Sequence, residues 1–356
     1  MKILTIVGAR PQFIKAATVS RAFKAYPSIH EIILHTGQHY DANMSDVFFE
    51  QMEIPKPEIH LGIKSALHGQ MTGRMIEGIE DAILKIKPDG VLLYGDTNST
   101  LAGALAACKL FIKIIHVEAG LRSFNMHMPE EINRILTDRV SDLLCCPTRH
   151  AVENLEREGF ENFKATIVQT GDVMYDAALH YSERSQLKSK IMSQIGKDDF
   201  ILVTMHRAEN TNDPQRLTSI VEALNEIHKR RKVVLPLHPR TAKNMNALKL
   251  KVDFSIIEPQ SYFDMLELLK SCSLVITDSG GLQKEAYFFK KQCICLRDET
   301  EWIELLEGNH VFLAGADKSK IIMLFNELYD KPARFDEFYY GIGNASSEVV
   351  RAIRSI

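Results

Sequence analysis

The sequence predicts an α/β protein made of two doubly wound halves, each built on a parallel sheet. Short runs rich in Ile, Val and Leu recur along the chain, and segments with helical apolar spacing lie between them. Strands buried on both faces of a parallel sheet have this continuous apolar character. With 356 residues the chain also has room for about two domains of roughly 150 residues each.

Two sets of apolar runs predict the strands. The first half comprises Lys2 to Gly8, Glu31 to Thr36, Gly90 to Tyr94, Ile114 to Val117 and Asp142 to Cys146. The second half comprises Thr166 to Gln169, Phe200 to Thr204, Lys232 to Pro236, Phe254 to Ile257, Leu274 to Thr277, Cys293 to Leu296 and His310 to Leu313. Helical spacing covers intervening segments such as Ser99 to Lys109, Pro129 to Val140, Pro214 to Arg230 and Tyr262 to Lys270.

We expect a first domain over residues 1–167 and a second over residues 168–343. The charged stretch 182–199 follows the first strand of the second half and fits a boundary in this region. At the end of the chain, Val349, Val350 and Ile353 share one helical face. We therefore expect the helix over 344–356 to fold back onto the first domain.

Composition excludes several classes of protein. Hydrophobic residues make up 45% and charged residues 25% of the chain, as in an ordinary globular protein, and a net charge of −3 offers no basic surface for nucleic acid. The apolar run from Ile3 to Ala9 stops at Arg10 and is too short for a signal peptide or a membrane span. The six cysteines lack metal-ligand spacing, which indicates reduced core residues, no metal and a cytoplasmic protein.

Polar residues follow the predicted strands repeatedly. Ligands of open parallel sheets bind beyond the carboxyl ends of the strands, where loops and helix N-termini converge. The strands end in Gly8-Ala9-Arg10-Pro11, Gly37-Gln38-His39, Gly95-Asp96-Thr97, Glu118-Ala119-Gly120, Met205-His206-Arg207, Leu237-His238-Pro239, Asp278-Ser279-Gly280-Gly281 and Arg297-Asp298.

Each of these residues also has a structural interpretation. Asp96 could cap the helix that follows it, and His206 or His238 alone could be a structural histidine. For Glu118 a functional role is favoured, because a carboxylate directly after an apolar strand needs either an ionic partner or a catalytic or binding role.

Ser279-Gly280-Gly281 lies between a strand and a helix, where glycines admit a diphosphate close to free backbone amides. The alternative is an ordinary loop glycine pair. Neither a GxGxxG nor a GxxxxGK[ST] motif occurs, which argues against a dehydrogenase and a P-loop enzyme.

Taken in order along the chain, the motifs resemble those of the non-hydrolysing UDP-N-acetylglucosamine 2-epimerases. They are Gly8-Ala9-Arg10-Pro11-Gln12-Phe13-Ile14-Lys15, Gly95-Asp96-Thr97, Val117-Glu118-Ala119-Gly120-Leu121-Arg122, Pro129-Glu130-Glu131-Ile132-Asn133-Arg134, His206-Arg207 with Glu209-Asn210, and Asp278-Ser279-Gly280-Gly281. The resemblance runs from residue 2 to about residue 315.

The resemblance implies a GT-B-like fold of two Rossmann-like domains facing a central cleft, no added cofactor, and a homodimer. It implies conversion of UDP-GlcNAc to UDP-ManNAc for surface polysaccharides such as lipopolysaccharide. By motif position, the implied catalytic residues are Arg10, Lys15, Asp96, Glu118, Glu130 and His206. The implied substrate-binding residues are His238, Gln260, Ser279, Gly280, Gly281 and Glu285. Gln38 and His39 match an interdomain site where some members bind UDP-GlcNAc as an activator.

Two segments depart from the usual family pattern. Thr300-Glu301-Trp302-Ile303-Glu304 has Trp302, the single tryptophan of the chain, where an arginine is expected near the ligand, and Pro239-Arg240-Thr241 follows His238. Both resemble a branch that includes epimerases of modified sugars, such as UDP-2,3-diacetamido-2,3-dideoxyglucuronic acid. That sugar is therefore the alternative substrate.

The residues suggest a mechanism in which UDP leaves the sugar before or with removal of the C2 proton. A hydrogen at C2 is not acidified by a carbonyl, so direct deprotonation would be too slow. Asp96, Glu118 and Glu130 would face the sugar, where one removes the proton to leave a 2-acetamidoglucal and another returns a proton to the opposite face. UDP would then add back at C1.

Three rival functions remain at this stage. A hydrolysing epimerase would release free UDP in step with product, and a GT-B glycosyltransferase would require an acceptor. A sensor that only binds nucleotide sugars would exchange no C2 hydrogen with any UDP-sugar.

Overall fold

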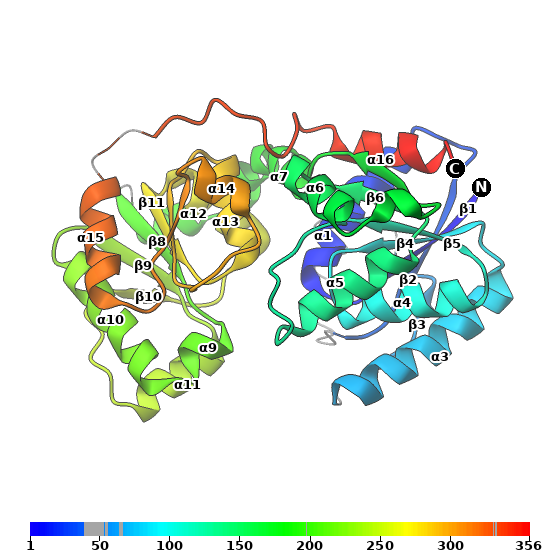
Figure 1. The fold of residues 1–356 in the computed structure, drawn as a ribbon. Coiled ribbons are helices and arrows are strands. Elements are labelled where there is room, and N and C mark those ends of the chain that lie inside the picture. Colours follow the sequence, from blue (N-terminus) through cyan, green and yellow to red (C-terminus); the bar gives the residue numbers. More distant parts are fainter. Residues whose placement is uncertain (39–52, 54–55, 64–66, 197, 330, 332) are drawn as a thin grey trace. The chain divides into compact units, whose positions relative to one another are not determined.

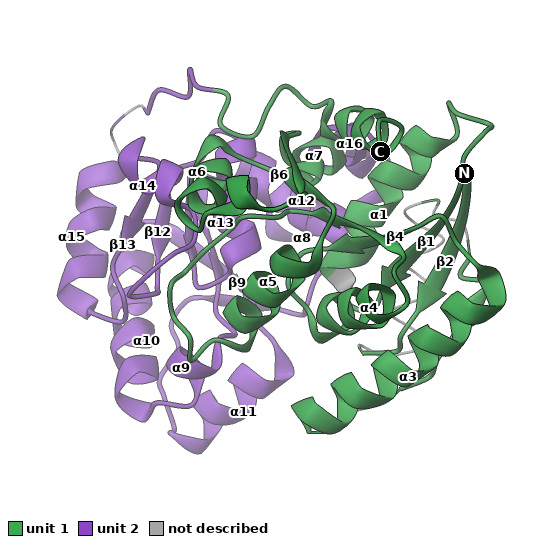
Figure 2. Ribbon diagram, turned by 45° about the vertical axis from the view of Figure 1, so that its right-hand side comes forward, with its two compact units in different colours: residues 1–177, 338–356 green, residues 178–337 purple. Residues whose placement is uncertain are grey.

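The computed structural model describes residues 1–38, 53, 56–63, 67–196, 198–329, 331 and 333–356. Contacts divide the chain into two compact units, residues 1–177 with 338–356 (unit 1) and residues 178–337 (unit 2), as Figure 2 shows. The sequence placed these divisions after residues 167 and 343. Helix α7 (Val173–Lys188) runs across the first division.

Unit 1 contains a parallel sheet of seven strands in the order β3-β2-β1-β4-β5-β6-β7 (Figure 1). The strands are β1 (Lys2–Val7), β2 (His30–His35), β3 (Ile59–His60), β4 (Gly90–Tyr94), β5 (Lys113–Val117), β6 (Leu143–Cys146) and β7 (Thr166–Gln169). The chain winds outward from β1 to one side and from β4 to the other, so the topological switch point lies between these two strands.

The helices of unit 1 lie on both faces of its sheet (Figure 1). They are α1 (Arg10–Phe23), α3 (His68–Ile86), α4 (Asn98–Lys109), α5 (Pro129–Val140), α6 (Arg149–Arg157), a 3₁₀ turn (Phe160–Asn162) and α16 (Ala345–Ile353). Buried aliphatic side chains of β1 and β4 pack with those of α3 and α4 in one core, for example Leu4, Leu93 and Ile79. The continuous apolar runs of the sequence are thus covered by helices on each side.

One strand assignment from the sequence was wrong. The segment Thr166–Gln169, expected in the second half, is β7 of the first sheet and pairs with β6. Helix α6 packs against both strands, and the short connection through it returns the chain to the adjacent edge position. An apolar run of four residues carries no information about which sheet it joins.

Unit 2 repeats the architecture with a parallel sheet of six strands in the order β10-β9-β8-β11-β12-β13. The strands are β8 (Phe200–Thr204), β9 (Lys232–Pro236), β10 (Ser255–Ile257), β11 (Leu274–Thr277), β12 (Cys293–Cys295) and β13 (Val311–Leu313). The helices are α8 (Ile191–Ile195), α9 (Ala208–Thr211), α10 (Pro214–His228), α11 (Pro239–Ala247), α12 (Tyr262–Ser271), α13 (Gly280–Phe288), α14 (Ile303–Glu307) and α15 (Lys318–Leu328). The switch point lies between β8 and β11. Two parallel-sheet α/β domains confirm the predicted fold class.

The C-terminal helix α16 packs against α1 in unit 1. The Asp176 carboxylate accepts hydrogen bonds from the Ala345 amide at 3.0 Å and from the Ser346 amide at 2.8 Å, so a side chain of α7 caps this helix. Burial raises the pKa of Asp176, although these bonds and that of the Ser346 hydroxyl oppose the rise.

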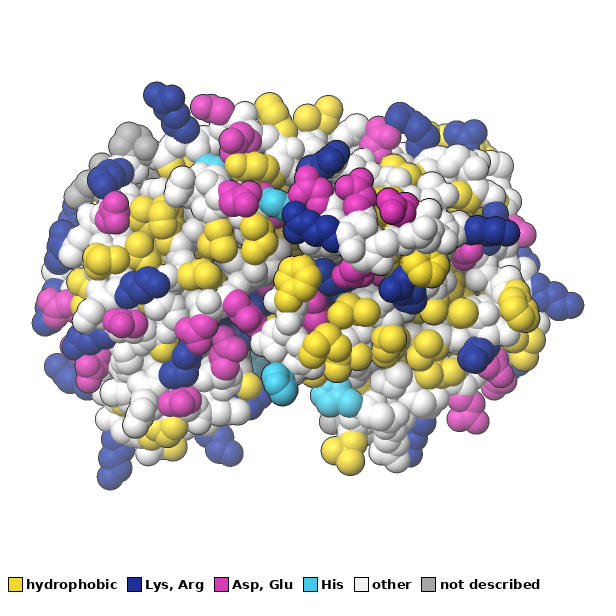
Figure 3. Space-filling model, in the orientation of Figure 1, with side chains coloured by type: hydrophobic (Ala, Val, Ile, Leu, Met, Phe, Trp, Pro, Cys, Tyr) yellow, Lys and Arg dark blue, Asp and Glu magenta, His cyan; other side chains and the backbone are white. Residues whose placement is uncertain are grey.

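Charged and hydrophobic side chains are interspersed over the face drawn in Figure 3. Among the helices that the structure describes, none combines the length and apolarity needed to cross a membrane. All six cysteines are free thiols, and every one except Cys108 is buried. Burial raises the pKa of the Cys145 thiol to about 12, which leaves it protonated and unreactive at neutral pH.

Candidate active site

The carboxyl ends of β4 and β5 bring two of the predicted acids together. Tyr94 and Val117 pair across these parallel strands. Asp96 comes two residues after Tyr94 and Glu118 one residue after Val117, at the same edge of the sheet. Lys15 of α1 forms an ion pair with the Glu118 carboxylate. Both side chains are about nine-tenths buried, with 9% and 11% of their surface exposed. Glu118 thus has the partner that its position after an apolar strand required.

The backbone at Glu118 is in the left-handed region, with φ at 73°. A non-glycine residue adopts this conformation at a cost of about 1–3 kcal/mol, so the surrounding structure must hold it. The amides of Glu118 and Ala119 both donate to the Cys145 carbonyl oxygen, at 3.0 and 3.1 Å. Two residues on, a Cβ at Gly120 would lie 2.3 Å from the Ala151 carbonyl oxygen, so only glycine fits there.

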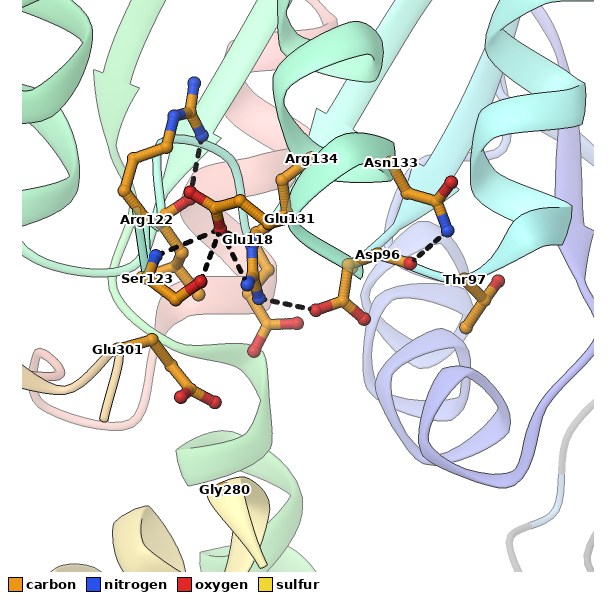
Figure 4. A network of polar contacts seen from close by, with 12 residues as sticks. Asp96, Thr97, Glu118, Arg122, Ser123, Glu131, Asn133, Arg134, Gly280 and Glu301 are labelled. Atoms are coloured by element: carbon orange, nitrogen blue, oxygen red, sulfur yellow. Dashed lines mark hydrogen bonds and ion pairs between the residues drawn. The ribbon is translucent and has the colours of Figure 1, made fainter. Parts of the chain in front are cut away.

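Asp96 does not cap the helix that follows it. Thr97 is the N-cap of α4 and accepts from the Thr100 amide. The Asp96 carboxylate instead forms an ion pair with Arg134 of α5 at 2.7 Å, and the Asn133 side chain donates to the Asp96 carbonyl oxygen at 2.8 Å (Figure 4). The capping interpretation of Asp96 was therefore wrong.

The pKa of Asp96 is raised above its ordinary value. Burial is the main cause, and the negative charges of Glu118 and Glu130 add to it, while Arg134 and Lys15 oppose it. A carboxyl group with a raised pKa exchanges protons more readily near neutral pH, which suits a general acid or base. The influence of Glu130 also puts that residue, at the start of α5, in the neighbourhood of Asp96.

Glu131 has a different task from its neighbour Glu130. Its carboxylate is fully buried and accepts from the Ser123 and Phe124 amides at 2.9 Å each, and from the Arg134 guanidinium (Figure 4). Burial would raise the pKa of Glu131, but the amide bonds and Arg134 outweigh it and lower the pKa. Glu131 therefore fixes Arg134, which in turn holds Asp96. Both residues belong to the motif Pro129-Glu130-Glu131-Ile132-Asn133-Arg134, but the sequence alone indicated no role for either.

Gln38 lies beside the N-terminus of α4, where its side-chain oxygen accepts from the Ser99 amide at 3.0 Å and from the Ser99 hydroxyl at 2.7 Å. His39, its partner in the expected activator site, lies outside the described residues. Arg10 is the first residue of α1, and its side chain is also outside the described part of the structure.

In unit 2 the neighbouring ends of β8 and β11 bring His206 next to Asp278. Asp278 is fully buried and accepts from the His206 amide at 3.0 Å and from the Arg207 amide at 2.9 Å. The His206 ring nitrogen Nδ1 lies 3.4 Å from the same carboxylate, and about half of the ring side chain is exposed. Burial of the rest lowers the pKa of His206 even though Asp278 favours the charged form. Asp278 thus orients the predicted histidine.

The predicted glycine pair starts helix α13. Ser279 is its N-cap and accepts from the Leu282 amide. A Cβ on Gly280 would lie 2.4 Å from the Glu301 carboxylate, whereas a Cβ on Gly281 would meet no atom within 4 Å. A side chain at Gly280 would thus have to displace the end of the Glu301 side chain, and the fold places no such demand on Gly281. An anion near this turn would meet the free amides of the helix N-terminus.

Trp302 is buried against the glycine turn. Its side chain is 3% exposed, and its indole nitrogen donates to the Gly280 carbonyl oxygen at 2.9 Å. The Lys284 ammonium lies over the indole ring, 4.2 Å from its centre. The tryptophan thus stabilises the glycine turn through this hydrogen bond.

Two of the remaining predicted binding residues, His238 and Gln260, follow strands of the second sheet. His238 is the N-cap of α11, where its Nδ1 accepts from the Arg240 amide at 3.3 Å, and its charge affects the pKa of His206. Gln260 follows β10 and donates to the Glu258 carbonyl oxygen at 2.6 Å. Glu285 lies within α13.

The chain is similar in sequence to epimerases of nucleotide sugars. A family model described as UDP-N-acetylglucosamine 2-epimerase matches residues 21–354. The chain belongs to the UDP-N-acetylglucosamine 2-epimerase family. It is 57% identical to UDP-2,3-diacetamido-2,3-dideoxy-D-glucuronate 2-epimerase of Pseudomonas aeruginosa, with all of both chains covered. It is 41% identical to the UDP-N-acetylglucosamine 2-epimerase of Methanocaldococcus jannaschii, with 99% of both chains covered.

Solved structures agree with this assignment. The M. jannaschii enzyme in complex with UDP-GlcNAc and UDP has a TM-score of 0.92 at 40% identity, with all of both chains covered. The Neisseria meningitidis UDP-GlcNAc 2-epimerase bound to UDP-GlcNAc has a TM-score of 0.91 at 32% identity, again over all of both chains. The resemblance seen in the motifs is confirmed, and the chain is an isomerase with a GT-B-like fold.

Proposed function

We propose that this chain inverts C2 of a UDP-2-acetamido sugar by eliminating UDP and adding it back. The observation that carries this proposal is the pair of strand-end acids, Asp96 and Glu118, each held by its own cation at one edge of the first sheet. Inversion needs one group to remove a proton and another to return it on the opposite face, and two separately held carboxyl groups provide for both.

In the first step the bond between C1 and the UDP oxygen breaks, and UDP leaves with the electron pair. A carboxylate of unit 1 removes the C2 proton, and the electrons of that C–H bond form the C1–C2 double bond of a 2-acetamidoglucal. A carboxyl group on the opposite face then protonates C2 while a UDP oxygen adds to C1. Asp96 is suited to one of these roles because its pKa is raised, and Glu118 and Glu130 are the candidates for the other.

We assign UDP binding to the glycine turn of unit 2. Ser279, Gly280 and Gly281 begin a helix whose free amides favour the negative charge of the diphosphate, and charge accumulates there when UDP departs. We propose His206 as a side-chain donor to UDP, because Asp278 accepts from its backbone amide and lies beside its ring. His238, Gln260 and Glu285 would complete the nucleotide site of unit 2, and Arg10 and Lys15 belong to the proposed catalytic set of unit 1.

We propose UDP-2,3-diacetamido-2,3-dideoxyglucuronate as the preferred sugar. The relative named for that substrate shares 57% of its residues with this chain, against 41% for the M. jannaschii enzyme named for UDP-GlcNAc. UDP-GlcNAc, with UDP-ManNAc as product, is the second candidate because several relatives carry that name.

One experiment tests both the reaction and the sugar. The purified protein is incubated with each UDP-sugar in deuterated water and followed by NMR. We expect deuterium at C2 of the product and a higher kcat/KM for the diacetamido uronate. Product without deuterium at C2 contradicts the elimination mechanism, and a higher kcat/KM for UDP-GlcNAc reverses the choice of sugar.

The same spectra separate the rival reactions. Free UDP that accumulates in step with product indicates a hydrolysing epimerase, and turnover only after an acceptor is added indicates a glycosyltransferase. An absence of C2 exchange with both sugars indicates a binding protein.

We further propose a cytoplasmic homodimer that serves surface polysaccharide synthesis and responds to UDP-GlcNAc as an activator. Sedimentation of the purified protein tests the dimer. Rates measured with the uronate at rising UDP-GlcNAc concentration test the activator, since a pure competitor only lowers them.

A further inference from the structure

A buried histidine lies beneath the two strand-end acids. His116 is the fourth of the five residues of β5, lies between Ile115 and Val117 in the sequence, and is fully buried. Its Nε2 lies 2.7 Å from the Gly95 carbonyl oxygen, and its Nδ1 lies 2.6 Å from the Asp138 carboxylate. The proposed mechanism assigns no role to either of these two hydrogen bonds.

The partners of His116 determine which of its nitrogens carry hydrogen. A carbonyl oxygen only accepts, so Nε2 must donate to Gly95. The other Asp138 oxygen accepts from Arg122 at 2.7 Å and from the Gly120 amide at 3.1 Å, as a carboxylate does. His116 and Arg122 lower the pKa of Asp138, although burial would raise it. Both ring nitrogens of His116 therefore face acceptor oxygens, Nε2 the Gly95 carbonyl and Nδ1 the Asp138 carboxylate.

This ion pair connects the two turns that carry the acids. His116 holds the carbonyl of Gly95, the residue before Asp96, and Asp138 holds the amide of Gly120, two residues after Glu118. Both turns have backbone in the left-handed region, with φ of 62° at Gly95 and 73° at Glu118. Glycine adopts this region without strain, whereas Glu118 keeps it only where surrounding bonds hold it.

The pair is itself anchored. Arg122 is almost completely buried and binds Asp138 through one nitrogen and Glu158 through two others, at 2.6 and 2.9 Å. Asp138 lies on α5, the same helix that carries Arg134, the partner of Asp96. The buried charges are thus fully hydrogen-bonded, which is the condition under which a buried ion pair can give a rigid, specific geometry.

We infer that His116 and Asp138 are positioning residues for the epimerisation, because they fix the spacing and direction of Asp96 and Glu118 on the sugar. The inference rests on the proposed function. A displacement of about 1 Å at reacting groups can cost about 10²-fold in rate without affecting groups elsewhere. UDP binding, assigned to unit 2, is then expected to be independent of the pair.

Two substitutions of His116 separate its two bonds. In His116→Gln the amide nitrogen can reach the position of Nε2 and keep the bond to Gly95. In His116→Asn it can reach the position of Nδ1 and keep only the bond to Asp138. We expect kcat and C2 exchange to fall about 10²-fold in H116N and less in H116Q, with KM and UDP affinity within about twofold of wild type.

Asp176→Asn is the matched control for stability, because it weakens a buried aspartate that caps α16 and touches neither acid. We expect it to lower the Tm and leave kcat unchanged at temperatures well below unfolding. The positioning role is contradicted if unfolding at the assay temperature accounts for the whole loss of activity in H116N. It is also contradicted if H116Q and H116N lose the same activity.

Nitrogen NMR on wild-type protein labelled at histidine gives a test that needs no activity. We expect both ring nitrogens of His116 to show a directly bonded hydrogen, and a single protonated nitrogen contradicts the inference even if no variant folds. If the wild-type protein exchanges no C2 hydrogen with either sugar, the proposed function is contradicted. The nitrogen NMR of His116 still decides in that case whether the ion pair exists.

Discussion

Units 1 and 2 share a doubly wound parallel sheet but use its carboxyl edge differently. In unit 1 the strand ends carry acidic side chains paired with Lys15 and Arg134, on turns with left-handed backbone. In unit 2 a buried Asp278 accepts backbone amides, and a glycine turn leaves the start of α13 open. One edge is suited to proton transfer and the other to an anion. The scaffold determines where chemistry occurs, and the residues determine which chemistry.

The largest expected effect comes from removing an acid of unit 1. Asp96→Asn or Glu118→Gln is expected to lower turnover by roughly 10²-fold or more, because the amide cannot transfer the C2 proton. UDP affinity, measured by calorimetry, is expected to stay near the wild-type value. Near-normal turnover removes that residue from the catalytic set, and equal losses of turnover and UDP affinity contradict the division of tasks between the units.

Changing Arg134 is expected to shift the pH profile. As the pH falls through the pKa of Asp96, its carboxylate becomes protonated. That pKa lies above the ordinary carboxyl value, and the acidic limb of the kcat/KM profile is expected to follow it. Arg134→Gln removes a charge that lowers the pKa of Asp96, so the limb moves to higher pH and activity at neutral pH falls about tenfold or more.

Arg134→Lys is the matched control because it keeps the positive charge, and we expect a smaller shift of the limb. An acidic limb that stays in place in R134Q means that Asp96 is not the group titrating in that range.

The two glycines of unit 2 are expected to behave differently. Gly281→Ala should leave the Tm unchanged, since its Cβ meets no atom, but weaken UDP binding about tenfold if the diphosphate approaches the turn. Gly280→Ala should lower the Tm, because its Cβ would lie 2.4 Å from Glu301. Thermal denaturation and calorimetry of both variants measure the contrast. If G281A binds UDP as tightly as wild type, the assignment of the diphosphate to this turn is contradicted.

The smallest effect is expected for Trp302→Phe. This change removes the indole donor to the Gly280 carbonyl and keeps an aromatic ring under Lys284. A lost hydrogen bond of this kind costs about 1 kcal/mol, so we expect a modest fall in Tm and UDP affinity weakened a few-fold. If W302F changes the ratio of kcat/KM between the two sugars and leaves UDP affinity unchanged, Trp302 contributes to sugar recognition and not to UDP binding.

Much of this arrangement could be predicted from the sequence. Apolar runs of four to six residues predict buried parallel strands, and polar residues directly after them predict a site at the carboxyl edge. Asp96, Glu118, His206 and Ser279 were predicted as site residues in this way. Thr166–Gln169 was assigned to the wrong sheet because strand pairing depends on where the preceding helix returns the chain.

Four residues of this arrangement were given no role from the sequence: His116, Asp138, Glu131 and Asp278. His116 was visible as a titratable residue inside an apolar strand, and Glu131 stood beside the predicted Glu130. Nothing local distinguishes a buried glutamate from an exposed one in the first turn of a helix, because the direction of each side chain depends on what packs against that turn.

The sequence by itself determined the two doubly wound halves, the residues at the strand ends and the family, because periodicity and motifs are local properties of the chain. The tertiary structure alone decided the partners of those residues. Glu118 faces Lys15 across 103 positions, and Asp96 faces Arg134 across 38. Such pairs form only when folding brings distant segments together, and the protonation and orientation of the acids follow from them.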